Sequence, residues 1–181
     1  MVNILPAQTY CAGEQISTYH QELNHVVCAG LDDYESGDMF KLSDYNGDVN
    51  GGNYHIIFIG LHASWWGVCW DYGVFVADQI VEEWSEYGVK VITSLQDPGQ
   101  PYSCTQWQDS GISGTPLIVL GNQSNTGLFS LFHDSWNVFP SFVLIDHTMT
   151  VRAKPWTLAN NSNTTSSCDG SNSLINGWSG G

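Results

Sequence analysis

The sequence predicts one α/β domain with a mixed β-sheet flanked by helices. Residues 53–63 and 89–95 contain continuous apolar runs of strand length, as expected for strands buried on both faces of a sheet. Between them, apolar side chains recur every three or four positions from Val74 to Tyr87, which indicates an amphipathic helix. This order of strand, helix and strand is typical of an α/β domain, and 181 residues are enough for a single core.

Two elements are predicted before the first central strand. The apolar positions of residues 14–27 fit a short amphipathic helix. Residues 31–34 and 39–42 have the β-propensity of paired strands, and the turn Glu35-Ser-Gly-Asp38 joins them as a hairpin.

The second half of the chain supplies the remaining elements. Gly88 follows the long helix as a stop signal. From about Trp156 onward Asn, Ser, Thr and Gly dominate, which is typical of a loop or tail without a core of its own. Cys168 and Trp178 indicate that this tail is tied back to the body or to a neighbouring subunit. In order, we expect a short helix at 103–111, a strand at 116–120, a strand at 142–145 after Pro140, and a half-exposed strand at 148–153.

Four motifs occur in an order that is specific as a set. They are Phe40-Lys-Leu-Ser-Asp-Tyr-Asn-Gly47, the strand and turn from Ile56 to Cys69, Trp107–Gly111 leading into Pro116-Leu-Ile-Val119, and Asn137-Val-Phe-Pro-Ser-Phe-Val-Leu-Ile-Asp146. This set resembles the redoxins, the peroxiredoxin-related branch of the thioredoxin-like superfamily, which includes secreted thiol-disulfide oxidoreductases. The resemblance implies a thioredoxin-like domain at 31–155, an N-terminal extension at 1–30 and a polar tail at 156–181. It also implies that Pro140 takes the family's cis-proline position.

The active-site turn of that family is altered in this chain. Residues 63–69 read A-S-W-W-G-V-C, where the family has A-x-W-C-G-P-C. Trp66 stands at the position of the attacking cysteine, and an indole cannot replace the thiolate that this chemistry requires. Only Cys69, at the resolving position, remains, and Val68 replaces the usual proline. The resemblance therefore implies the fold together with a degenerate redox site.

Several interpretations of this turn stay open. Cys69 is either an inert thiol or half-cystine one turn into the helix, which we favour, or a monothiol with Cys104 as its resolving partner. A peroxidase using Cys69 would require Thr or Ser three residues earlier, where Trp66 stands. UGA encodes Trp in some genetic codes and selenocysteine in others, so a selenocysteine rendered as Trp66 would restore a nucleophile. Trp65 and Trp66 form a stacking platform for a peptide or sugar, or Trp66 fills the groove near Pro140.

The charge is strongly lopsided, with 18 Asp and Glu against 4 Lys and Arg and a formal net charge of -14. Such a field repels nucleic acid and anionic lipid, so we expect protein partners or self-association instead. No run approaches the roughly 20 apolar residues of a membrane helix, and the first 30 residues lack the basic start and apolar core of a signal peptide. We therefore expect no membrane insertion, and any signal peptide has been removed or never existed.

The cysteines and Asn-linked triplets favour a secreted, extracellular or periplasmic setting. Five cysteines without a C-x-x-C pair disfavour structural zinc and predict one or two long-range disulfides. The disulfide candidates are Cys11, Cys28, Cys104 and Cys168. Glycosylation triplets begin at Asn122, Asn160 and Asn163, so glycans are candidate partners.

We expect no metal and no cofactor. Residues 44–50 superficially resemble a calcium loop but lack the Gly and the acidic residue at its sixth and twelfth positions. The six histidines show no metal spacing, and a copper site on Cys69 and His133 would lack a second thiolate. The predicted function is a non-catalytic structural, self-assembling or interaction module outside the cytoplasm. The alternative is a thiol-disulfide oxidoreductase or peroxidase that acts through Cys69 or a selenocysteine at 66.

Overall fold

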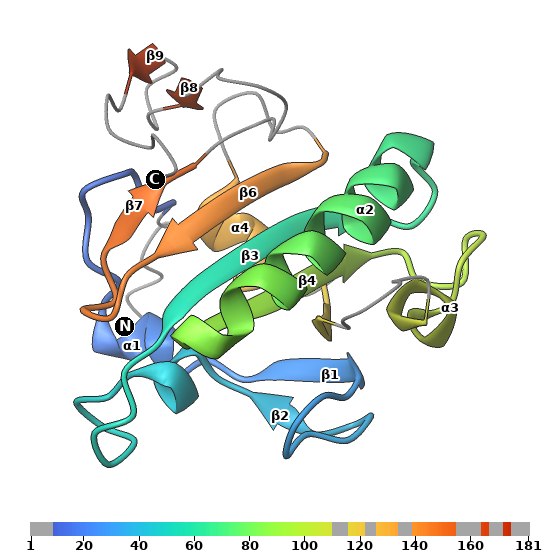
Figure 1. Ribbon diagram of the computed structural model, residues 1–181. Coiled ribbons are helices and arrows are strands. Elements are labelled where there is room, and N and C mark those ends of the chain that lie inside the picture. Colours follow the sequence, from blue (N-terminus) through green and yellow to red (C-terminus); the bar gives the residue numbers. More distant parts are fainter. Residues whose placement is uncertain are drawn as a thin grey trace, which may run out of the picture.

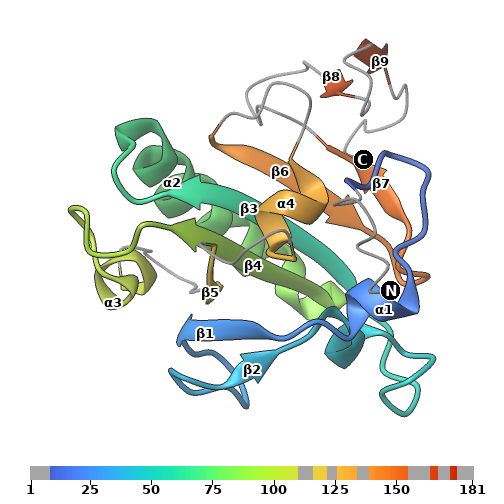
Figure 2. The same ribbon diagram turned by 180° about the vertical axis from the view of Figure 1, so that it is seen from behind.

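One mixed sheet of seven strands organises the molecule, in the order β2-β1-β5-β4-β3-β6-β7 (Figures 1 and 2). The structure is a computed structural model and describes residues 9–109, 116–121, 126–133 and 139–154, with the backbone alone at 72, 74–80, 164–166 and 172–174. The strands of this sheet are β1 (His25–Ala29), β2 (Met39–Phe40), β3 (Ile56–Ala63), β4 (Val89–Gln96), β5 (Leu117–Leu120), β6 (Ser141–Ile145) and β7 (Val151–Ala153).

Helices cover both faces of the sheet. The long helix α2 (Gly67–Trp84) crosses one face, and α4 (Leu128–Phe132) lies on the other, as the two opposite views show (Figures 1 and 2). The other described elements are α1 (Thr18–Gln21), α3 (Cys104–Gln108), the 3₁₀ turns η1 (Leu42–Tyr45) and η2 (Ser85–Tyr87), and the short strands β8 (Thr164–Ser166) and β9 (Asn172–Leu174).

The pairing of the strands confirms the predicted mixed sheet. Strands β3, β4 and β5 run parallel, while β6 pairs antiparallel with β3 and β7 pairs antiparallel with β6. Seven of the eight β3 residues are buried, because helix α2 covers one face of this strand and the main core the other. Gly88 ends the η2 turn with φ of 80°, in the left-handed region that favours glycine.

The predicted helix over residues 14–27 is wrong for most of its length. Only Thr18–Gln21 is helical, and His25–Ala29 forms strand β1. The side chains of β1 alternate between buried and half-buried, which is the period of a strand rather than of a helix. Strand β1 lies in the segment expected to be an N-terminal extension, and it pairs antiparallel with β5 inside the main sheet.

The predicted hairpin also has different arms. Strand β2 pairs with β1, through His25↔Phe40 and Val26↔Met39, so residues 31–34 are part of the connection. Asp32 in this connection has φ of 58°, which takes the chain out of an extended path. The polar tail, expected to be a loop, contains the antiparallel pair β8 and β9.

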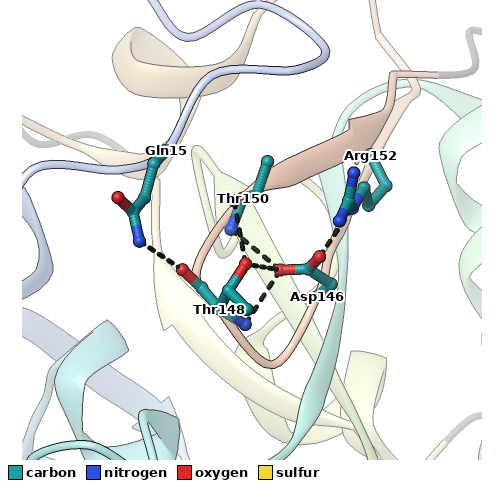
Figure 3. Close-up of polar contacts among 5 residues, drawn as sticks. All are labelled: Gln15, Asp146, Thr148, Thr150 and Arg152. Atoms are coloured by element: carbon teal, nitrogen blue, oxygen red, sulfur yellow. Dashed lines mark hydrogen bonds and ion pairs between the residues drawn. The ribbon is translucent and has the colours of Figure 1, made fainter.

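The N-terminal segment is fastened to the β6–β7 turn at the other edge of the sheet (Figure 3). Gln15 forms an isolated antiparallel bridge with Thr150, and its side-chain Nε2 donates to the carbonyl of Thr148 at 2.8 Å. The carboxylate of Asp146 organises the turn itself. Its Oδ1 accepts from the backbone N–H of Thr148 and Thr150 at 2.9 and 3.0 Å, and its Oδ2 accepts from Arg152 Nε at 2.6 Å.

Candidate functional site

The A-S-W-W-G-V-C turn connects the carboxyl end of β3 to the amino end of α2. Trp66 is the N-cap residue of α2, with extended backbone angles of -103° and 112°. Its carbonyl accepts from the N–H of Cys69 at 2.9 Å and of Trp70 at 3.2 Å, which closes the first turn of the helix. Its indole makes no capping hydrogen bond. Position 66 therefore lies at the N-terminus of the long helix, where the helix dipole stabilises an anion, and an indole occupies it.

Trp65 and Trp66 both project into solvent. Their exposed fractions are 52% and 45%, and that of Val68 is 43%. The two indoles contact each other edge to face, with ring centroids 5.9 Å apart. Nearly half of the surface of Trp66 is therefore accessible to water. We call Trp65, Trp66 and Val68 the turn surface.

The loop after β4 is bound to this turn. The buried hydroxyl of Ser64 lies between the backbone carbonyls of Asp97 and Gln100, and its contact with Gln100 is 3.0 Å. The carboxylate of Asp97 accepts a hydrogen bond of 3.1 Å from Nε1 of Trp65. Asp97 has φ of 51°, a left-handed conformation that is uncommon for a residue with a side chain. Sequence reasoning missed both Ser64 and Asp97.

Cys69 points into the interior instead of the solvent. Its side chain is 0% exposed and packs in an apolar cluster that includes Ala63, Leu95 and Trp107. Burial raises the pKa of the Cys69 thiol to about 12, against a smaller opposing effect from the Ala63 N–H, which donates to Sγ at 3.4 Å. The thiol is therefore protonated at neutral pH and has no access to a substrate disulfide.

Cys104 is not a resolving partner for Cys69, because it is bonded to Cys28. This disulfide joins β1 to α3 with a Cα–Cα distance of 5.8 Å, and it packs beside the cluster that holds Cys69. Cys11 is disulfide-bonded as well, and Cys69 is a free cysteine. The remaining candidates, Cys168, Asn122, Asn160 and Asn163, lie outside the described residues.

Aromatic side chains close the interior side of the turn. Trp70 stacks on Tyr102 with centroids 3.8 Å apart, and its ring meets Trp107 at 89°. Helix α2 comes close enough to Trp107 that a Cβ on Gly73 would lie 2.8 Å from that indole. The only sequence signal for Trp70 was its place beside the motif, and there was none for Tyr102. Their stacking holds the segment before α3 against α2.

Pro140 lies at the start of β6, next to the central strand. The Phe139–Pro140 peptide bond is cis, and Ser141 pairs with Leu61 of β3. Phe139 packs against the cluster that contains Cys69. The proline position of the motif thus lies beside the same interior that the turn covers.

Both carboxylates of the calcium-like loop accept hydrogen bonds from protein groups. Oδ2 of Asp44 accepts from Tyr34 and from the Lys41 N–H, both at 2.7 Å, and Asp48 accepts from Tyr54 at 2.8 Å. Within the described ranges no group of three or more His, Cys, Asp or Glu side chains has a metal-binding arrangement. His133, the other residue of the copper interpretation, follows α4 and contacts Thr9. In the same part of the chain, no helix is long and apolar enough to cross a bilayer.

Solved structures identify the fold. No protein-family model and no curated protein matches the chain. A protein assigned as a disulfide isomerase from Bacteroides thetaiotaomicron superposes with a TM-score of 0.54 at 16% identity, over 80% of this chain and 78% of that one. Peroxiredoxin Q of Xanthomonas campestris superposes with a TM-score of 0.55 at 12% identity, over 79% of this chain and 85% of that one. For a secreted disulfide oxidoreductase of Mycobacterium tuberculosis the TM-score is 0.53 at 10% identity, over 84% of this chain and 93% of that one.

These similarities show the class of fold. The chain has the thioredoxin-like fold, which confirms the predicted fold class. At these identities the likeness concerns the arrangement of the backbone alone. Function has to be argued from the turn and its surroundings.

Proposed function

We propose that this chain is a redoxin-branch interaction module, which binds a protein partner through the turn surface and carries out no thiol chemistry there. One observation carries the proposal. The cysteine that remains in the motif is fully buried, while the position of the missing nucleophile holds an exposed indole. The part of the turn that a partner can touch is therefore apolar and aromatic.

The chemistry of exchange supports the same conclusion. Attack on a disulfide or peroxide requires a thiolate that reaches the substrate. Burial raises the pKa of the Cys69 thiol to about 12, so the thiol is almost entirely protonated at pH 7. No atom of Cys69 reaches the solvent.

The exposed side chains favour binding. The turn surface consists of three residues within four positions of the sequence, Trp65, Trp66 and Val68. Each of them has more than two fifths of its surface in solvent. Exposed aromatic side chains that cluster at one site are typical of interaction surfaces. The proposed partner is a protein or a second copy of this chain.

The proposed setting is outside the cytoplasm. The bond between Cys28 and Cys104 and the disulfide state of Cys11 are typical of oxidising compartments. Glycosylation at Asn122, Asn160 and Asn163 belongs to the same proposal.

The second candidate function is a selenol-dependent oxidoreductase, and the location of residue 66 favours it. A selenocysteine there would be exposed at the N-terminus of an 18-residue helix, where the helix dipole stabilises an anion. Mass spectrometry of the purified protein separates the two candidates, because Trp and selenocysteine differ in mass at residue 66.

Redox assays test the proposal directly. Insulin reduction and peroxide consumption are measured with the wild-type protein and with Cys69→Ser. We expect no turnover by either protein, and alkylation of Cys69 by iodoacetamide only after unfolding. Turnover that Cys69→Ser abolishes would show that the thiol is catalytic and would refute the proposal.

A further inference from the structure

All four basic side chains have hydrogen-bond or ion-pair partners within the protein. Three of them form ion pairs, Lys41 with Glu22 at 3.0 Å, Lys90 with Asp32 at 2.8 Å and Arg152 with Asp146 at 2.6 Å. The fourth, Lys154, is 2% exposed and donates to the carbonyls of Tyr10 and His133. The formal charge of -14 is therefore carried by carboxylates that greatly outnumber these four cations.

Carboxylates flank the turn surface on two sides. Asp97 lies beside Trp65, whose Nε1 donates to it at 3.1 Å. The exposed Asp71 is three residues after Val68 in α2, so the two side chains neighbour each other on the helix. The nearest basic residue in sequence to Asp97 is Lys90, at the opposite end of β4. The exposed indoles of the turn surface thus have negative charge beside them.

We propose that the turn surface binds a basic peptide segment, whose Arg or Lys side chains stack on Trp65 and Trp66 and pair with Asp97 and Asp71. This inference rests on the proposed function and specifies the chemistry of the partner. A cation over an indole face is attracted by the ring's quadrupole, and a guanidinium also stacks on the ring. The bond from Trp65 to Asp97 uses the N–H in the plane of the ring, so it brings a carboxylate beside the indole without covering its faces.

The charge distribution favours this partner over the alternatives. An acidic peptide would be repelled by the net charge of the chain. A neutral glycan would stack on the indoles but would gain nothing from the flanking carboxylates. Only a cationic segment uses both features of the turn surface.

Two peptides of one shape test the charge requirement. A fluorescein-labelled glycine–arginine repeat peptide is titrated with the full chain, and binding is followed by anisotropy. The matched peptide has citrulline in place of each arginine, which keeps the size and removes the charge. We expect the citrulline peptide to bind at least about 10-fold more weakly, and the arginine peptide to weaken as NaCl rises from 50 to 500 mM.

Paired variants locate the binding. Trp66→Leu and Asp97→Asn are expected to weaken the arginine peptide about 5- to 30-fold, as loss of a cation–π contact or of an ion pair would do. Trp84→Leu and Glu86→Gln are the matched controls. Trp84 is 42% exposed and lies at the far end of α2, Glu86 is exposed in η2, and both variants should bind as the wild type does.

The outcomes separate this inference from the proposed function. If the citrulline peptide binds as tightly as the arginine peptide, and Trp66→Leu abolishes that binding, the partner is not basic. The proposed function as an interaction module would still stand. The inference would be overturned if Trp66→Leu and Trp84→Leu weakened peptide binding equally, or if the arginine peptide did not bind at all. It would also be overturned if the protein bound maltohexaose instead of the peptide and that binding required Trp66. The redox assays judge the proposed function independently of each result.

Discussion

Nε1 of Trp65 donates a hydrogen bond to the carboxylate of Asp97, a residue 32 positions later in the chain. The bond forms because β3 and β4 are parallel neighbours, so their carboxyl ends, at Ala63 and Gln96, lie side by side. It gives one exposed indole a fixed neighbour and places a negative charge at the edge of the turn surface. The orientation of Trp65 therefore depends on the loop that follows β4.

Substitution of Asp97 is expected to reveal two opposing effects. Asp97→Ala removes the bond to Trp65 and keeps a Cβ at φ of 51°, so we expect a loss of about 1 kcal/mol in the free energy of unfolding. Asp97→Gly also removes the bond but relieves the left-handed strain, so its loss should be smaller. Urea titrations of the two variants give the comparison. A glycine variant less stable than the alanine variant would contradict the strain at Asp97.

Trp66→Cys is expected to create redox activity. The introduced thiol would occupy the N-cap of α2 in solvent, where the helix dipole lowers a thiol pKa below its usual value of about 8.5. We expect insulin reduction by this variant, and loss of that activity in the double variant with Cys69→Ser. Thiolate absorbance at 240 nm against pH measures the pKa. Trp65→Cys, one residue before the N-cap, is the control and should stay inactive.

The central elements could be predicted because local patterns determine them. The apolar run of β3 and the three- to four-residue repeat of α2 are each visible in a single segment. Strand β1 was missed because the apolar residues from Ile16 to Val27 also fit a helix, and only pairing with β5 decides between the two periods. The contacts of Ser64 with the 97–100 loop join residues more than 30 positions apart. No pattern within one segment could show them.

Stability is expected to fall in mild acid because of two buried histidines. Burial lowers the pKa of His25 to about 4 and that of His62 to about 3, from an ordinary value of 6.5. The unfolded chain takes up these protons more readily, so stability is complete above pH 6.5 and declines as the pH falls below 6.5, down to about pH 4 for His25 and about pH 3 for His62. His25 alone should contribute about 3 kcal/mol of this decline by pH 4.

His25→Leu tests the origin of the acid sensitivity. Neither ring nitrogen of His25 has a hydrogen-bond partner within the described structure, so leucine removes the titration without breaking a bond. Urea midpoints between pH 3.5 and 7.5 should show a shallower decline than in the wild type. His147→Gln, at an exposed position, should leave the decline unchanged. Equal slopes for His25→Leu and the wild type would contradict this assignment.

Asp146 is expected to stabilise the β6–β7 turn as a carboxylate (Figure 3). Its partial burial acts to raise the pKa, but hydrogen bonds from Thr148, Thr150 and Arg152 outweigh this and lower it from 3.8 to about 2. The corresponding stability is present above pH 3.8 and is lost as the pH falls through 2. Asp146→Asn should therefore lower the free energy of unfolding by about 2 kcal/mol at pH 7.

Two comparisons check the role of Asp146: the effect of Asp146→Asn on stability at different pH values, and the effect of the same substitution at a control site. The difference between Asp146→Asn and the wild type should shrink at pH 2, where the wild-type carboxyl is half protonated. Asp33→Asn changes the same charge at an exposed residue and should cost less than about 0.5 kcal/mol. A constant difference at both pH values would mean that the charge of Asp146 is not the stabilising feature.

The N-terminal segment covers backbone at two places in the sheet. Residues 13–16 line the outer side of the β6–β7 corner, and the same segment then continues to β1, which separates β5 from β2 near the opposite edge. One stretch of fewer than twenty residues thus covers the β5 side of the parallel strands and the outer edge of the sheet at β7. Its removal would leave the open backbone of β5 and β7 available to neighbouring molecules. A shortened chain that begins after residue 30 is therefore expected to aggregate through its sheet edges instead of folding as a smaller domain.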